Sequence, residues 1–370
     1  MINSEEKKNK TPFLVAHPGE ILQDELEARG LTQSEFSEII GRPARTVNEI
    51  INGKRAITPE SARVIAAALG TSADLWLGMQ SEYDLYLLKD KSKFKESEVS
   101  KRSELYSLFP VPELIRRKYL PPRMKNTSEL CKAVLELFNM SNLDQFRKDV
   151  CTANFRTSKT GDIVSNYLKA WVLLGKKEAE KIKGVGKYDS TALEKFAFEI
   201  KQYSQNNDGI KEIITKLGHI GVRVIFLPHF FKTRVDGAVT WITPNEPVII
   251  MSLRYDRIDN FYFTLLHEIG HVLKHPNRVF SDDINDTGTE KEENEANDFA
   301  SNAFGFDDVV KDLRRANVDA MTIKSVSLEL NIHPGLLIGR LHHEHILDYG
   351  QYRKALVRIK DGIPNTLQMK

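Results

Sequence analysis

One segment, residues 261–274, limits the fold more than any other part of the sequence. Its positions are mostly apolar and suit a helix, yet it carries the pentad His267-Glu268-Ile269-Gly270-His271. Residues four apart share a helix face, so both imidazoles can point at one ion, while Glu268 is rotated by about 100°. The apolar neighbours indicate a buried helix, and buried histidines need partners. Two histidines on an exposed helix is the alternative that these neighbours argue against.

This spacing is typical of a zinc site that keeps a water molecule available for chemistry. The two histidines supply ligands, and Glu268 is placed to hold the water rather than the metal. Zinc lowers the pKa of its bound water toward neutrality, and a neighbouring carboxylate can take the proton as the water attacks a peptide carbonyl. The sequence therefore predicts a metallopeptidase-type centre with Glu268 as general base and Zn²⁺ as cofactor.

The third ligand is expected from a second helix just downstream. Small and apolar residues define its inward face: Ala296, Phe299, Ala300 and Ala303. Glu293 lies on that face, whereas Glu292 and Glu295 are rotated off it and are expected at the surface. Asn297, one turn after Glu293, can hydrogen-bond a ligand imidazole. The predicted metal ligands are His267, His271 and Glu293.

At the other end of the chain, residues 19–77 predict four or five short helices punctuated by glycines. Thr32 and Glu35 form a capping box, Gly41 and Pro43 end that helix, and residues 44–51 form the next. Two short helices around a tight turn can place a recognition helix in the DNA major groove. The residues expected at DNA are Gln33, Arg42, Arg45, Thr46, Asn48, Lys54 and Arg55.

The charge of this region leaves its role open. Residues 1–80 hold nine Lys and Arg against eleven Asp and Glu, and DNA affinity depends heavily on phosphate neutralisation. Locally, four basic residues against Glu49 leave a positive edge around the expected recognition helix. A helix-turn-helix used only to dimerise or to bind a toxin partner is the alternative.

The length of 370 residues predicts several domains. We expect an all-α helix-turn-helix bundle over residues 1–80, a helical connecting domain over 81–205 and a zincin-like domain over 206–370. Strands are expected only at residues 222–227, 238–242 and 248–251. The predicted fold class is therefore mainly α with a small β-sheet, an α+β protein.

Composition excludes some classes. No window approaches the eighteen or so uncharged apolar residues of a membrane helix, and the first ten residues lack the apolar core of a secretion signal. The two cysteines, Cys131 and Cys151, have no metal-ligand spacing and are expected to be reduced, which favours the cytoplasm. The net charge of +2 neither favours nor excludes nucleic acid.

Residues 206–350 resemble the ImmA/IrrE family of metallo-endopeptidases. The resemblance is carried by the lead-in Phe261-Tyr262-Phe263-Thr264-Leu265, the pentad, and Glu293-x-x-Ala296-Asn297-x-Phe299-Ala300. It implies zinc held by His267, His271 and Glu293, Glu268 as general base, and a specific transcriptional repressor as substrate. The segment Ala303-Phe304-Gly305-Phe306 departs from the Leu-rich, Pro-ended family pattern, which puts the shape of the substrate cleft in doubt.

Residues 17–84 resemble the HigA-type subgroup of the Xre-like helix-turn-helix family. The resemblance is carried by five short sequence segments: His17-Pro18-Gly19-Glu20, Leu31-Thr32-Gln33, Gly41-Arg42-Pro43, Asn52-Gly53-Lys54-Arg55-Ala56-Ile57-Thr58-Pro59 and Leu69-Gly70-Thr71-Ser72.

Together the two ends predict a DNA-binding regulator with zinc-dependent endopeptidase activity, which cleaves a repressor or itself. The alternative is a HigA-like antitoxin or repressor whose zinc domain senses or binds protein without turnover. The retention of Glu268 favours the enzyme, because a purely structural zinc site gains nothing from this carboxylate. The expected partners are operator DNA, a protein substrate, a toxin and a second copy of the chain, but no membrane.

Overall fold

The computed structural model describes residues 15–149, 163–231, 233–277, 280–281, 290–360 and 363. Contacts group the chain into two units, residues 1–100 and 101–370. Helix α5 (Ala73–Leu108) belongs to both. The three-segment division expected from the sequence stays a prediction. Among the described residues, no helix is both long enough and apolar enough to cross a bilayer.

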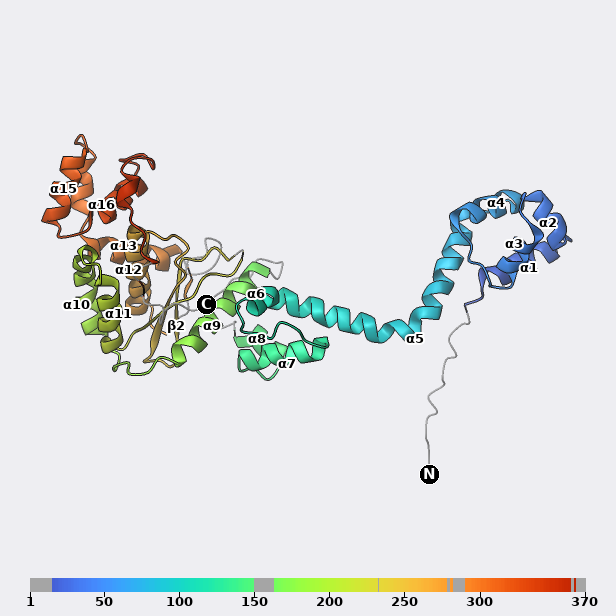
Figure 1. Cartoon of the computed structure of the whole chain (residues 1–370), viewed down its shortest axis with the longest axis horizontal. Coiled ribbons are helices and arrows are strands. Elements are labelled where there is room, and N and C mark those ends of the chain that lie inside the picture. Colours follow the sequence, from blue (N-terminus) through green and yellow to red (C-terminus); the bar gives the residue numbers. More distant parts are fainter. Residues whose placement is uncertain are drawn as a thin grey trace, which may run out of the picture. The chain divides into compact units, whose positions relative to one another are not determined.

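The first unit is a helical bundle (Figure 1). Its helices are α1 (Pro18–Ala28), α2 (Gln33–Ile39), α3 (Ala44–Ile51), α4 (Pro59–Leu69) and the start of α5. The expected capping box is present: the Glu35 N–H donates to Thr32 Oγ1 at 3.2 Å, and the Thr32 N–H donates to the Glu35 carboxylate at 2.8 Å. The bundle closes around buried Leu22, Phe36 and Ile50.

His17 and Gly19 fix the start of this bundle. The buried His17 accepts a hydrogen bond from the Gly19 N–H at 2.9 Å and so caps α1. A Cβ on Gly19 would lie 2.1 Å from the carbonyl oxygen of Ile50, so only glycine lets α1 approach α3 this closely. The segment His17-Pro18-Gly19 therefore has a role in packing α1 against α3.

The second unit is built around a four-stranded sheet in the order β1-β3-β2-β4. The strands are β1 (Arg223–Phe226), β2 (Gly237–Trp241), β3 (Pro247–Met251) and β4 (Phe280–Ser281). β1 pairs with β3 in parallel, whereas β2 is antiparallel to β3 and β4. Three strands match the expected positions within one residue. β4 was not predicted, because two residues are too few to show an alternating pattern.

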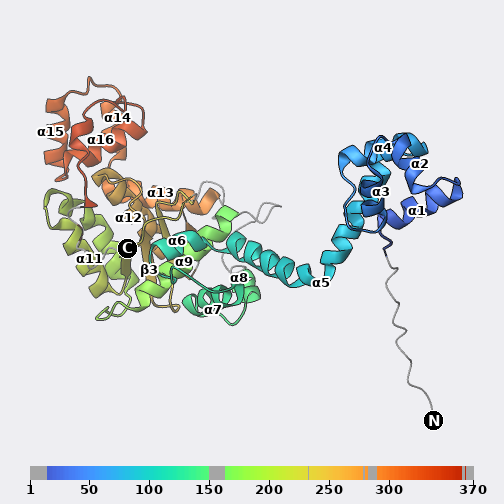
Figure 2. The same cartoon turned by 45° about the vertical axis from the view of Figure 1, so that its right-hand side comes forward.

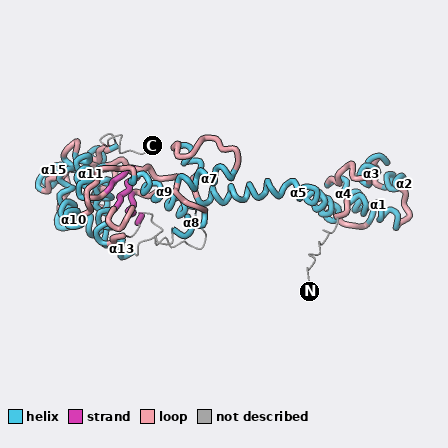
Figure 3. The backbone as a smooth tube through the Cα atoms, turned by 90° about the horizontal axis from the view of Figure 1, so that it is seen from below, coloured by secondary structure: helices cyan, strands magenta, loops and turns pink. Residues whose placement is uncertain are grey.

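Helices cover both faces of this sheet (Figure 3). One face packs on α10 (Ser190–Glu199), α11 (Gly209–Ile220) and α12 (Ile258–Lys274), and the other on α9 (Ile163–Glu180). A Cβ on Gly175 of α9 would meet Ile250 Cδ1 at 2.3 Å, which shows how closely that helix lies on β3. Part of the expected helical middle thus shares a core with the sheet.

The remaining elements complete the second unit. They are α6 (Val111–Arg116), α7 (Thr127–Leu137), α8 (Leu143–Asp149), the 3₁₀ helix η2 (Ile200–Gln205), α13 (Glu290–Phe304), α14 (Asp307–Leu313), α15 (Ala320–Glu329), α16 (Pro334–His343) and η3 (Arg353–Ala355). Figure 2 shows α14, α15 and α16 close together. The fold class is confirmed as mainly helical with a small sheet. Cys131 is half-buried and free, and Cys151 lies outside the described residues.

Candidate metal centre and DNA-binding face

Helix α12 carries the pentad and is buried on almost every side, as the sequence indicates. His267, Glu268 and His271 all lie within its buried stretch. The partner helix is α13, which approaches α12 at Gly270: a Cβ there would lie 3.1 Å from the Ala296 Cα. The glycine inside the pentad therefore lets the two helices come close enough for side chains from both to meet.

Three side chains from these helices converge on one point. The Nε2 atoms of His267 and His271 are 2.9 Å apart, and the Glu293 carboxylate oxygens lie 3.3 Å from His267 Nε2 and 3.5 Å from His271 Nε2. Ligands around a tetrahedral zinc with bonds of 2.0–2.1 Å are about 3.3 Å from one another. The three groups are thus spaced as they would be around a single ion, and they form a possible metal site among the described residues.

Asn297 sets the orientation of one imidazole. Its Oδ1 lies 3.0 Å from His267 Nδ1 and can accept a hydrogen bond only when that nitrogen carries the proton. The lone pair of His267 then resides on Nε2, which faces His271 and Glu293. A partner on the second ring nitrogen is a regular feature of histidine metal ligands.

The charge of Glu293 also suits a metal ligand. Burial would raise its pKa, but His267 and His271, in the protonated form that they can adopt without a metal, outweigh burial through hydrogen bonds and positive charge and lower the pKa to about 2. The carboxylate is therefore ionised at every physiological pH. Two imidazoles and one carboxylate are a donor set that zinc prefers, and it leaves one tetrahedral position open.

Glu268 follows His267 directly on α12 and is therefore rotated by about 100° from the two histidines, toward a different side of the helix. Its side chain is fully buried and touches the first residue of β2, since a Cβ on Gly237 would lie 2.3 Å from Glu268 Oε1. Gly237 is a residue that the sequence analysis missed. A single glycine at the start of a strand gives no signal of its own, because its importance depends on what packs across from it.

Other histidines near this centre have structural partners. His275 ends α12, and its Nε2 lies 3.4 Å from the Glu295 carboxylate. At the end of α16, His342 is buried and its Nε2 donates to the carbonyl oxygen of Gln351 at 2.9 Å, whereas His343 is exposed. Neither the Glu295 contact nor the Gln351 contact involves a predicted metal ligand.

The residues expected at DNA surround α3 in the first unit. Asn48 donates to Gln33 Oε1 at 3.1 Å, and Gln33 donates to Gln23 Oε1 at 3.1 Å, so a chain of amides joins α1, α2 and α3. Arg45 stands free of the core with 89% of its side chain exposed. The Thr46 side chain is half-buried, and Lys54 and Arg55 follow in the exposed turn after α3.

Acidic residues already pair with three of these arginines. Glu49 lies 2.8 Å from Arg45 Nε and 3.1 Å from Arg55 Nε, and Arg42 forms an ion pair with Glu60. The hydrogen bond from Arg45 is the main cause that lowers the pKa of Glu49. Two carboxylates, Glu49 and Glu60, thus offset about half of the positive charge expected at this edge, in keeping with the acidic excess of the region.

A second pair of helices repeats the turn geometry of α2 and α3. Between α15 and α16, Asn331 has φ +52°, as Gly41 has φ +62° between α2 and α3, and both second helices begin after an extended residue. Most of α16 is buried, however, and it packs against α12. The turn alone therefore does not mark a DNA-binding helix.

Comparisons with known proteins match two separate parts of the chain. Residues 22–76 match the helix-turn-helix family model, and residues 218–304 match the IrrE N-terminal-like domain, a peptidase family. Virulence-associated protein I of Dichelobacter nodosus is 37% identical over 79 residues, which are 21% of this chain and 71% of that protein. Antitoxin HigA-1 of Vibrio cholerae is 38% identical over 69 residues, which are 18% of this chain and 65% of that protein.

Among solved structures, a HigA-family addiction module antidote protein from Coxiella burnetii is 34% identical, with a TM-score of 0.21. The match covers 22% of this chain and 88% of that structure.

Proposed function

Because this chain belongs to the helix-turn-helix family of DNA-binding regulators and carries an IrrE-like peptidase domain, we propose that it is a zinc-dependent endopeptidase whose substrate is a specific transcriptional repressor. The observation that carries the proposal is the convergence of His267, His271 and Glu293, with Glu268 buried beside them. A structural zinc site usually fills its fourth position with a protein ligand, whereas the part of the chain that the structure describes offers three.

The roles of the residues follow from their positions. His267, His271 and Glu293 would hold zinc, and Asn297 would keep His267 in the tautomer that presents Nε2. When bound, zinc polarises the peptide carbonyl and lowers the pKa of a water molecule. Glu268 takes a proton from the attacking water and passes it to the nitrogen of the leaving amine as the C–N bond breaks. Its burial excludes bulk water as a competing proton acceptor.

The helix-turn-helix would bring this peptidase to its target. We propose that Arg45, Thr46 and Asn48 reach base edges, while Gln33, Arg42, Lys54 and Arg55 contact the phosphate backbone. Operator binding of this kind usually involves two copies of a chain, so we also propose a homodimer. The relative named as an antitoxin supports a toxin as a further partner.

Two measurements test the peptidase proposal. Elemental mass spectrometry should find one zinc per chain in wild type and Glu268→Gln, and less in His271→Ala and Glu293→Gln. Cells that produce wild type should then contain new protein N-termini that are absent with Glu268→Gln. Full zinc without such N-termini would favour the antitoxin in which the zinc domain does not turn over; no zinc in any preparation would contradict the metal centre itself.

A further inference from the structure

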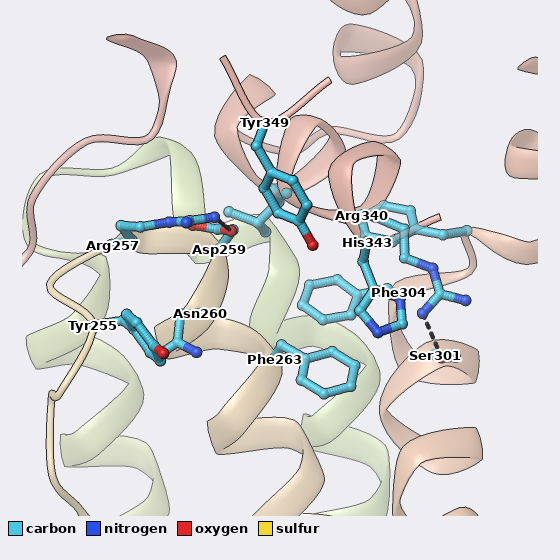
Figure 4. Close-up of a pocket in the computed structure, with 13 residues that line it drawn as sticks. Tyr255, Arg257, Asp259, Asn260, Phe263, Ser301, Phe304, Arg340, His343 and Tyr349 are labelled. Carbon is cyan, nitrogen blue, oxygen red and sulfur yellow. Dashed lines mark hydrogen bonds and ion pairs between the residues drawn. The ribbon is translucent and has the colours of Figure 1, made fainter. Parts of the chain in front are cut away.

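A cavity of about 440 Å³ lies where the first half of α12, the end of α13 and α16 meet. Its apolar part is formed by half-buried Phe263 and by buried Phe304, Phe306 and Leu336. The rings of Phe304 and Phe306 stack with centroids 4.8 Å apart. Figure 4 shows Phe263 from α12 and Phe304 from α13 in the centre, with polar side chains around them. The volume lies in the range of ligand pockets.

The charged groups around this cavity are already neutralised. Arg257 donates to Asp259 at 3.0 Å, and Arg340 lies 3.0 Å from Glu344 and 3.6 Å from Asp307. A charged ligand would have to displace these carboxylates or repel them. The chemistry of the cavity therefore suits an uncharged, mainly apolar group that covers the aromatic rings and meets polar atoms at its edge.

The cavity continues the metal centre along the seam between α12 and α13. Asn260 and Phe263 stand on the same face of α12 as His267, and the Phe263 ring lies 6.3 Å from the His267 imidazole. On α13, Ser301 follows Glu293 by eight residues, or about 12 Å along the helix. An extended peptide advances about 3.3–3.6 Å per residue, so a peptide at the metal reaches the cavity within roughly three residues.

We propose that this cavity is a specificity pocket that receives a large apolar or aromatic side chain of the substrate, within about three residues of the cleaved bond. The inference rests on the proposed peptidase function. It assigns a role to Phe304 and Phe306, which lie where the sequence departs from the family pattern, and it predicts selection for tryptophan, phenylalanine or leucine near the cleavage site.

The first experiment measures binding without catalysis. N-acetyl-tryptophanamide, titrated by NMR saturation transfer into the zinc-loaded full chain, should bind in the millimolar range, whereas N-acetyl-glycinamide should not. Ser301→Trp and Asn260→Trp, which fill the cavity from opposite helices, should each weaken this binding at least fivefold. Leu328→Ala, at an exposed position of α15, is the matched control and should leave it unchanged. Absence of binding at 10 mM, or binding that neither filling variant affects, would overturn the proposal.

A second experiment tests whether the cavity and the metal serve one ligand. Two pairs of dipeptides are compared, one with a hydroxamate at the N-terminal end and one with a hydroxamate at the C-terminal end. Within each pair, the residue away from the hydroxamate is tryptophan in one compound and glycine in the other. The better tryptophan compound should bind at least tenfold more tightly than its glycine partner, and the difference should vanish in Ser301→Trp. Equal binding within both pairs would overturn the specificity pocket and leave the zinc centre standing. Binding of tryptophanamide but of no hydroxamate would instead contradict the zinc centre.

Discussion

At the scale of single residues, the candidate catalytic carboxylate of Glu268 fits in its place because Gly237 has no side chain. The Glu268 carboxylate occupies space beside Gly237 that a methyl group would need, and Thr264 Cγ2 would lie only 2.9 Å from the same methyl group. Neither neighbour can retreat easily, because Glu268 and Thr264 are both buried. Gly237 is therefore required by the site and not by the strand.

Gly237→Ala should displace Glu268 and leave the metal ligands in place. We expect zinc content to be unchanged and cleavage to slow by about 100-fold, the usual cost of misplacing a reacting group by about 1 Å. Cleavage assays quenched at fixed times measure the rate, and elemental analysis measures the zinc content. Gly218→Ala is the matched control, because the space around Gly218 is open. Retention of full activity by Gly237→Ala would show that Glu268 tolerates the shift.

Asn297→Ala should weaken zinc binding by about 10- to 100-fold, as expected when the partner of a ligand histidine is removed. The reason is that His267 then loses the acceptor that fixes its tautomer. Competition against a coloured chelator measures the affinity. Asp298→Asn, exposed on the same helix, should have no effect; an equal loss in both variants would point to a general change in α13.

Much of the metal site could be predicted from the sequence at this scale. His267, His271, Glu293 and Asn297 follow one rule, that residues three or four apart share a helix face, and the structure brings these four together. Gly237 could not be predicted, because its contact with Glu268 joins two positions 31 residues apart in different elements. Similarly, the ion pair between Arg55 and Glu49 depends on how the chain turns after α3, which composition does not specify.

At the scale of elements, α6 holds the loop that follows β1. Arg117 donates to the carbonyl oxygens of Pro228 and His229, and Glu113 accepts from the Phe231 N–H at 2.8 Å. Arg117 and Glu113 are also paired at 2.6 Å and are almost completely buried. This loop leads toward Gly237, so α6 supports the strand that borders the Glu268 carboxylate.

Arg117→Met should destabilise the second unit by about 3–5 kcal/mol, because it leaves the Glu113 carboxylate buried without its cation. Burial raises the pKa of Glu113, but the Phe231 N–H and Arg117 outweigh it, so the pKa is lowered from 4.5. The stabilisation is therefore present above pH 4.5 and is lost as the pH falls through the lower, folded-state value. Denaturant unfolding at pH 7 and at a series of pH values falling from 4.5 measures it.

The neighbouring Arg116 gives the control for this prediction. It contacts the same carboxylate at 2.7 Å but keeps 74% of its side chain exposed. Arg116→Met should cost less than about 1 kcal/mol. A loss as large as that of Arg117→Met would mean that burial does not decide the energy of this pair.

The strands illustrate how far element prediction reaches. Runs of β-branched residues predicted β1, β2 and β3 within a residue, because both faces of these strands are buried and their composition shows it. The placement of α9 could not be predicted. Its contact with β3 depends on Gly175 meeting Ile250, 75 positions away, and a helical pattern does not reveal which sheet it covers.

At the scale of the whole molecule, the division into two units predicts two unfolding events. In calorimetry, zinc at 100 times its dissociation constant should stabilise the second unit by about 2.7 kcal/mol. The unfolding transition of the first unit should not change. His271→Ala provides the control, since its second transition should not respond to zinc. A single transition that shifts as a whole would contradict independent units.

The motifs at the two ends could be predicted from the sequence because each lies within a short stretch of residues. The division at residue 100, inside the 36-residue α5, was not, because no change of composition marks a boundary within a continuous helix.

The carboxylates that pair with Arg42, Arg45 and Arg55 have a consequence for the search for a target. A genome presents about 10⁶ to 10⁹ sites of unrelated sequence, and all of them compete through phosphate charge alone. With Arg42, Arg45 and Arg55 paired to carboxylates, we expect the first unit to dissociate quickly from such sites, so that base contacts set how long it stays on DNA. Glu49→Gln removes that restraint, and this regulator would then spend more of its time on the wrong DNA.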